Sequence, residues 1–172
     1  MKLRTIPESD FDQIDSSWLV IADEHARRFA ALELGGTLGC YGLSWRSELI
    51  EPIVELSPDG MTAWIGVDQQ LAAIGLPTGR LHVALTLNTN ILQILSVEQA
   101  TAILTETEVL LFNPDFSIRL NKGLPDLAEG ISIVGSGLAI RLMEGASLTF
   151  DPQTGIISCP KLAEEEADSD DI

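Results

Sequence analysis

The sequence has few of the residues that build disulfide-stabilised or redox-active proteins. Its 172 residues include two cysteines, Cys40 and Cys159. Two cysteines so far apart do not form a disulfide framework, and there is no C-x-x-C pair. We interpret both as ordinary thiols, with a single bridge between them as the alternative.

Histidine is equally scarce, and this limits the chemistry that the chain can support. His25 and His82 are the two histidines, and no H-x-x-x-H or Cys/His cluster is present, which argues against zinc. The stretch 135–137 (GSG) is typical of a hairpin turn and lacks the G-x-S-x-G pattern of a nucleophile elbow. We therefore expect no metal ion, no cofactor and no catalytic residues.

Long apolar runs are also missing. No run reaches the roughly 18–20 residues that a membrane-spanning helix needs. Residues 1–15 lack the apolar segment of a secretory signal peptide, which predicts a cytoplasmic location.

Positively charged residues are also few in comparison with acidic ones. Ten Lys and Arg face 26 Asp and Glu, so the formal net charge is −16. A negative surface repels phosphate groups, and no basic stripe offsets it. We expect neither nucleic acid nor an anionic membrane as a partner.

What the sequence does contain is a repeat. Three segments share the order apolar strand, acidic residue, short turn, apolar strand, and a turn with Pro or Gly, and they start at positions 65, 103 and 141, 38 residues apart. The repeated acids are Asp68, Glu106 and Glu144.

Between the repeated segments, further short strands are indicated. Residues 80–87 alternate between apolar and other side chains, and turn residues recur every 8–12 positions. One repeat then holds about four strands, near 65–68, 71–76, 80–87 and 91–97. The prediction is an all-β, antiparallel fold of hairpin repeats.

The turn endings Thr78-Gly79 and Thr154-Gly155 resemble those of quinone-dehydrogenase-type β-propeller blades. The resemblance covers about residues 61–157; the middle copy departs from it at Phe116-Ser117. It implies four-stranded blades that stack on one another in a closed ring, an open stack or half of a dimeric ring. A rolled sheet or a sandwich of hairpins is the alternative.

Three parts of the chain are expected. Residues 1–16 are a polar lead-in, 17–160 a single β-repeat domain and 161–172 an acidic disordered tail. Within 17–34 we favour a degenerate first hairpin with its turn near 23–25, over one helix stopped at Gly35.

The expected function is that of a non-catalytic module that binds a protein partner. In one version of this hypothesis the partner is a basic protein. Residues 35–47 predict a glycine-rich loop with two aromatic residues and an arginine, residue types enriched at interface anchors. The candidate binding residues are Tyr41, Trp45, Arg46, Arg27 and Arg28. Association of copies through edge strands is a further expectation.

The alternative is a small enzyme, or a protein that binds a ligand or cation in a carboxylate-lined pocket at one end of the sheets. Equivalent repeat positions bring carboxylates to one edge, where they could hold a hard cation. The candidates for this site are Asp68, Glu106, Glu108 and Glu144.

Overall fold

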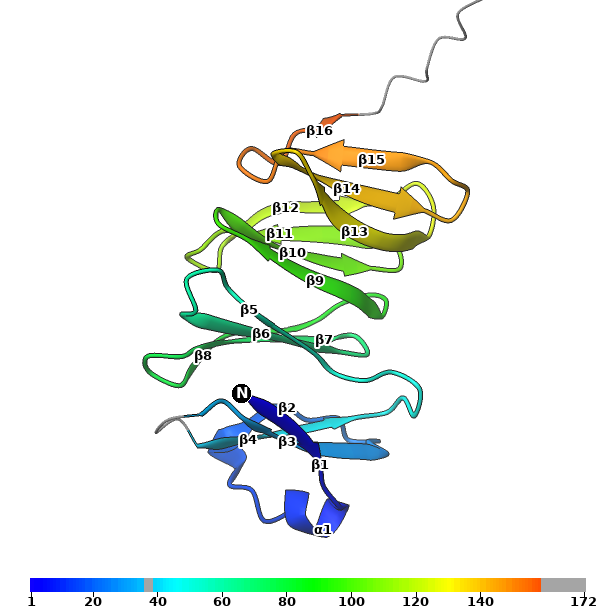
Figure 1. Ribbon diagram of the computed structural model, residues 1–172. Helices are drawn as coiled ribbons and strands as arrows, with labels where there is room; N and C mark the ends of the chain where they lie inside the picture. Colours follow the sequence, from blue (N-terminus) through cyan, green and yellow to red (C-terminus); the bar gives the residue numbers. More distant parts are fainter. Residues whose placement is uncertain (36–38, 159–172) are drawn as a thin grey trace, which may run out of the picture.

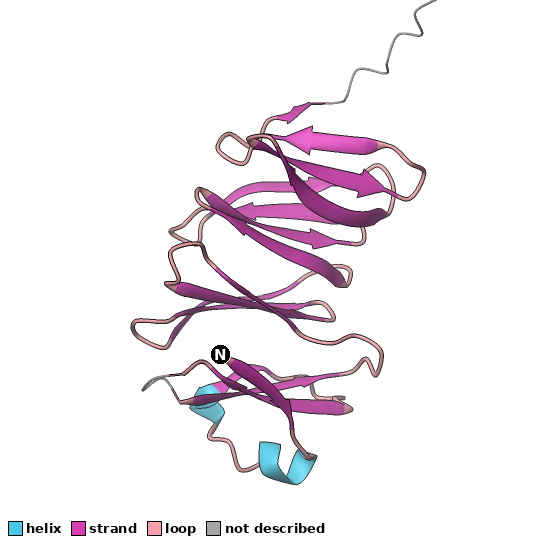
Figure 2. Cartoon of the chain, in the orientation of Figure 1, coloured by secondary structure: helices cyan, strands magenta, loops and turns pink. Residues whose placement is uncertain are grey.

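The computed structural model describes residues 1–35 and 39–158. Four four-stranded sheets follow one another along the chain and lie in a stack, with the N-terminal sheet at one end (Figure 1). Among the described residues, helix is confined to two short segments before the second strand (Figure 2). The expected all-β fold is confirmed, and the expected acidic tail at 161–172 lies outside the described residues, as does Cys159.

The second, third and fourth sheets are antiparallel, and in each the strands lie side by side in chain order. The second sheet comprises β5 (Ile53–Leu56), β6 (Thr62–Val67), β7 (Gln70–Gly75) and β8 (Arg80–Thr86). The third comprises β9 (Ile91–Val97), β10 (Ala100–Thr105), β11 (Glu108–Phe112) and β12 (Ile118–Gly123). The fourth comprises β13 (Ala128–Val134), β14 (Gly137–Leu142), β15 (Ser147–Phe150) and β16 (Ile157–Ser158).

The first sheet has a different connection. It contains β1 (Lys2–Thr5), β2 (Leu19–Ile21), β3 (Arg28–Glu33) and β4 (Cys40–Trp45), in the spatial order β1-β3-β4-β2. The strand prediction for 17–34 is therefore correct and the helix alternative is wrong. The expected hairpin is wrong in its pairing, because β2 lies parallel to β4 and β3 pairs with β4 and β1.

Three of the four apolar clusters in the core form layers, one between each pair of neighbouring sheets. Adjacent residues of one strand enter different layers: Trp64 packs toward the third sheet and Ile65 toward the first. Such continuous burial on both faces is what a stack of sheets requires. The four separate sheets rule out a rolled sheet or a two-layer sandwich.

The outer face of the first sheet is covered by the N-terminal segment. Helix α1 (Glu8–Phe11) and the 3-10 turn η1 (Ser16–Trp18) lie beyond this sheet, and Ile6 and Phe11 pack on Ala31 and Phe29. The expectation of a loose polar lead-in at 1–16 is therefore wrong: its few apolar residues cover a sheet face.

At the other end of the stack, the outer face of the fourth sheet is mainly small or polar. Ser132, Ala139, Arg141 and Ser147 share this face across β13, β14 and β15. Arg141 pairs with Glu129 at 2.6 Å. Neither end therefore presents the kind of apolar face that neighbouring sheets bury between them.

Among the described helices, none has the length and apolar character needed to cross a bilayer.

Candidate functional site

The stack has two long edges that carry different turns. We name as the acid-turn edge the one formed by the turns at 68–69, 106–107 and 143–146, together with the loops that join successive sheets. The opposite one, the proline-turn edge, carries the turns that contain Pro58, Pro77, Pro114 and Pro152, and the β9–β10 turn at 98–99.

The repeated acids do lie at the acid-turn edge, but they do not act together, because Asp68 and Glu106 each hold a neighbouring loop. The Asp68 Oδ2 atom accepts hydrogen bonds from the backbone N–H groups of Arg46 (3.0 Å) and Ser47 (3.1 Å). Glu106 accepts from the Asn90 side chain at 3.4 Å. Glu144 is exposed, and its backbone N–H donates to Asp126.

Glu108, the fourth candidate carboxylate, is buried and accepts a hydrogen bond from the Asn88 side chain at 3.4 Å. The four candidates therefore do not converge on one pocket. Within the described part of the chain, no group of three or more acidic, histidine or cysteine side chains is arranged to hold a metal ion.

Thr105 organises the neighbouring turn. Its fully buried hydroxyl accepts from the backbone N–H groups of Thr107 and Glu108 and from the Thr89 hydroxyl, and it donates to the Glu108 carbonyl. Replacing Thr105 by valine keeps the shape but removes these four hydrogen bonds, including those from the backbone N–H groups of Thr107 and Glu108. We expect a loss of about 1–3 kcal/mol in the free energy of unfolding, measured by urea denaturation.

The exposed Thr86 is the matched control for this substitution, because among the described residues its hydroxyl bonds to the Gln70 side chain alone. Thr86→Val should change the unfolding free energy by less than about 0.5 kcal/mol. Equal effects of the two substitutions would contradict a structural role for Thr105.

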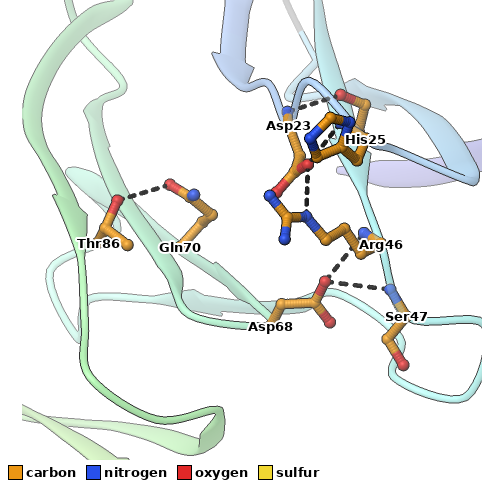
Figure 3. A network of polar contacts seen from close by, with 8 residues as sticks. Asp23, His25, Arg46, Ser47, Asp68, Gln70 and Thr86 are labelled. Carbon is orange, nitrogen blue, oxygen red and sulfur yellow. Dashed lines mark hydrogen bonds and ion pairs between the residues drawn. The ribbon is translucent and has the colours of Figure 1, made fainter.

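A polar network joins the first and second sheets at the acid-turn edge (Figure 3). The Arg46 Nε donates to Asp23 Oδ1 at 2.8 Å, and both lie beside Asp68 at a cavity of about 390 Å³. Burial raises the pKa of Asp23, but hydrogen bonds from Arg46 and His25 outweigh it, so the pKa lies below its usual value. The single arginine faces two aspartates in this network and forms its ion pair with Asp23. The Asp68 Oδ1 atom is buried and has no hydrogen-bond partner among the described atoms.

The aromatic candidates of the predicted loop are buried instead. Residues 40–45 form β4, in which Tyr41, Leu43 and Trp45 alternate toward the second sheet. Trp45 is 1% exposed and its Nε1 donates to the Ile50 carbonyl at 2.8 Å. The expected glycine-rich loop is therefore wrong, because its alternation of apolar residues is that of a buried strand.

The candidate cations are paired with acids of the same chain. Arg27 lies 3.5 Å from Glu48, and Arg28 lies 2.9 Å from Glu51. Arg28 also lies over the Trp45 ring, with its guanidinium carbon 5.9 Å from the ring centroid. These arginines thus already have intramolecular partners.

A different cavity, of about 310 Å³, opens between the second and third sheets at the proline-turn edge. It is lined by Ser57, Pro58, Asp59, Thr62, Trp64, Val97, Glu98, Ala100, Thr101, Asn113, Pro114 and Phe116. Two of these side chains are carboxylates, and no lysine or arginine is among the described residues of the lining. Hydrogen bonds from the Ser57 hydroxyl and the Met61 backbone lower the pKa of Asp59, so Asp59 is ionised at neutral pH.

No role for the residues of this second cavity follows from the sequence alone. The one signal was Phe116-Ser117, where the middle repeat departs from the Thr-Gly turn endings. Phe116 stacks on His82, with ring centroids 4.3 Å apart and an interplanar angle of 6°. That stack joins the third sheet to the outer strand of the second.

Comparison with known proteins supports the fold and names no family. No protein-family model matches the sequence, and no curated protein matches it. A chain in a crystal structure of the mitotic checkpoint complex is similar in structure, with a TM-score of 0.52 at 12% sequence identity. The match covers 91% of this chain and 52% of that chain, so this chain spans about half the length of its neighbour. The similarity supports a propeller-like fold.

Proposed function

We propose that the protein is a non-catalytic interaction module whose proline-turn edge binds a positively charged region of a protein partner. The observation that carries this proposal is that the acidic residues of this edge lack ion-pair partners among the described residues. Asp59, Glu98, Asp115 and Asp151 lie in turns of this edge, and none of them forms an ion pair within the described part of the chain.

The aspartates of this edge are held in place by their own turns. Asp115 accepts hydrogen bonds from the hydroxyl and the backbone N–H of Ser117, which lower its pKa. Asp151 accepts from the backbone N–H of Gln153 at 2.7 Å. Fixed, ionised carboxylates attract a basic surface at long range and lose little side-chain entropy when it binds.

Two arginines belong to the same edge, and one of them is already engaged. Arg119 donates to the Asn113 side chain and to the carbonyl groups of Gln99 and Pro152. Arg80 is exposed at the start of β8. Four acids against two arginines leave the edge negative. The similar chain belongs to a protein complex, which agrees with an interaction role.

The test uses a lysine- and arginine-rich peptide of about 20 residues as the probe, with binding measured by isothermal calorimetry at low salt. The edge variant carries Asp59→Asn, Glu98→Gln, Asp115→Asn and Asp151→Asn; asparagine retains the turn-capping hydrogen bonds. We expect an affinity loss of about tenfold or more, and a weaker dependence of binding on salt.

The matched control removes the same amount of charge elsewhere, through Glu8→Gln, Asp10→Asn, Asp12→Asn and Glu24→Gln, all exposed beside the first sheet. It should reduce affinity by less than about threefold. Equal losses in both variants would show non-specific attraction to net charge and would reject the proposed edge, as would an unaffected edge variant.

A further inference from the structure

One turn of the proline-turn edge has a phenylalanine at the position where its two counterparts have a glycine with positive φ. The β7–β8 and β15–β16 turns place Gly79 and Gly155 in the left-handed backbone region, at φ of 67° and 71°. The β11–β12 turn places Phe116 there, at φ of 68°. This turn is one residue shorter, because Asn113 N bonds to Ser117 O whereas Asp151 N bonds to Ile156 O.

A bulky residue in the left-handed region is costly. An L-residue with a side chain loses roughly 1–2 kcal/mol there, and glycine avoids this cost. Phenylalanine lacks the short polar side chain that lets Asn or Asp occupy the region. Such strain persists where the position serves another purpose.

The Phe116 ring forms part of the wall of the cavity between the second and third sheets. It is fixed by the parallel stack on His82, and its centroid lies 6.1 Å from that of Trp64. Gly75 leaves the space for His82, since a Cβ at position 75 would lie 2.6 Å from the His82 Nε2. The stack on His82, a residue of the second sheet, therefore holds Phe116 in place.

The rest of the cavity lining is polar and negative. Asp59 and Glu98 supply the two carboxylates, and Ser57, Thr62 and Thr101 contribute hydroxyl-bearing side chains. A volume of about 310 Å³ is at the small end of ligand pockets and suits one side chain. Aromatic rings together with carboxylates form the environment that stabilises an organic cation.

We propose that this cavity binds a lysine or arginine side chain of a basic protein partner, with Phe116 as its aromatic wall and Glu98 and Asp59 as its counter-charges. The inference rests on the proposed function for the source of the side chain. The cavity beside Arg46 is a poorer match for a cation, because an arginine already lines it.

The test uses three short probes: acetyl-Ala-Arg-Ala-amide, acetyl-Ala-Lys-Ala-amide and the neutral citrulline analogue of the first. Binding is followed by ¹H–¹⁵N NMR of the full chain. We expect saturable shifts of residues 57–64, 97–101 and 113–117 with the two cationic peptides, at dissociation constants near the millimolar range. The citrulline peptide should produce no saturable shift.

Two variants test the named residues. Phe116→Gly removes the ring while suiting the left-handed backbone, so the turn is retained, and Glu98→Gln removes one charge at constant shape. Each should weaken the cationic peptides about fivefold or more. Glu144→Gln, exposed at the opposite edge, should change their affinity by less than twofold.

The outcomes separate the cavity from the broader function. If the tripeptides fail to bind while the long basic peptide still depends on the edge acids, the cavity inference is overturned and the proposed function stands. If the tripeptides bind at the cavity but the edge acids do not matter for the long peptide, the cavity chemistry is supported and the proposed function fails. Binding that is unchanged in Phe116→Gly overturns the role of the ring.

Discussion

Trp45→Ala is expected to remove about 3–5 kcal/mol from the free energy of unfolding. Trp45 is a large, fully buried side chain in the layer between the first and second sheets, beside Leu43 and Ile65. Its truncation leaves a cavity there and deprives the Ile50 carbonyl of the indole N–H. Since the total stability of a domain is commonly about 5–15 kcal/mol, this single change is a large part of it.

The measurement is urea denaturation followed by far-ultraviolet circular dichroism, which does not depend on the tryptophan that is removed. Leu49→Ala is the control, because Leu49 lies a few residues away and is 95% exposed. It should change the unfolding free energy by less than about 0.5 kcal/mol. A Trp45→Ala protein within 1 kcal/mol of the wild type would contradict the buried position and restore Trp45 as a surface anchor.

The repeated part of the fold was predictable because the sequence carries the same local signals three times. Asp68, Glu106 and Glu144 mark equivalent turns between the second and third strands of successive sheets. Gly79 and Gly155 mark the turns that need a positive φ. Strand alternation and turn residues act over a few positions, so a single sequence is enough to recognise them.

The first sheet was harder to predict because its pairing is non-local. Strand β2 lies beside β4, some twenty residues further along, and no short-range pattern specifies that parallel contact. Closely spaced glycines at position 39, just before β4, and at position 42, within it, favoured a loop, yet Gly42 is needed because Leu19 and Phe11 pack against its backbone. Tertiary packing thus decided the role of the glycine.

The candidate site could be predicted only in part for a similar reason. The excess of acidic over basic residues indicated a basic partner, but the sequence cannot show which acids are paired inside the protein. Asp68 and Asp23 are used to hold Arg46 and its neighbour, whereas Asp59 and Glu98 face a cavity without a cation among its described residues. The deviation at Phe116 was visible in the repeat, but its contact with His82 required the structure.

Phe11→Ala is expected to destabilise the protein by about 3 kcal/mol, near the low end for a buried phenylalanine. Phe11 is 9% exposed, and its ring centroid lies 5.2 Å from that of Phe29 on β3. The expected loss follows from its place over the outer face of the first sheet, which would otherwise be open to water. Urea denaturation measures the change, and Asp10→Ala on the exposed side of the same helix is the control, expected within about 0.5 kcal/mol.

Gly42→Ala examines the same contact from the side of the sheet. A Cβ at position 42 would lie 2.7 Å from the Leu19 Cδ2 and 3.0 Å from the Phe11 Cε2, so the N-terminal segment would have to move. Overpacking of this kind costs about 1–3 kcal/mol. Because the extra methyl group collides with the Phe11 ring, the two substitutions are coupled, and the double variant should lose less than the sum of the single losses. If residues 1–16 were a loose lead-in, Phe11→Ala would unfold like the wild type, and the loss in Gly42→Ala, which then reflects only the clash with Leu19, would show no coupling to it.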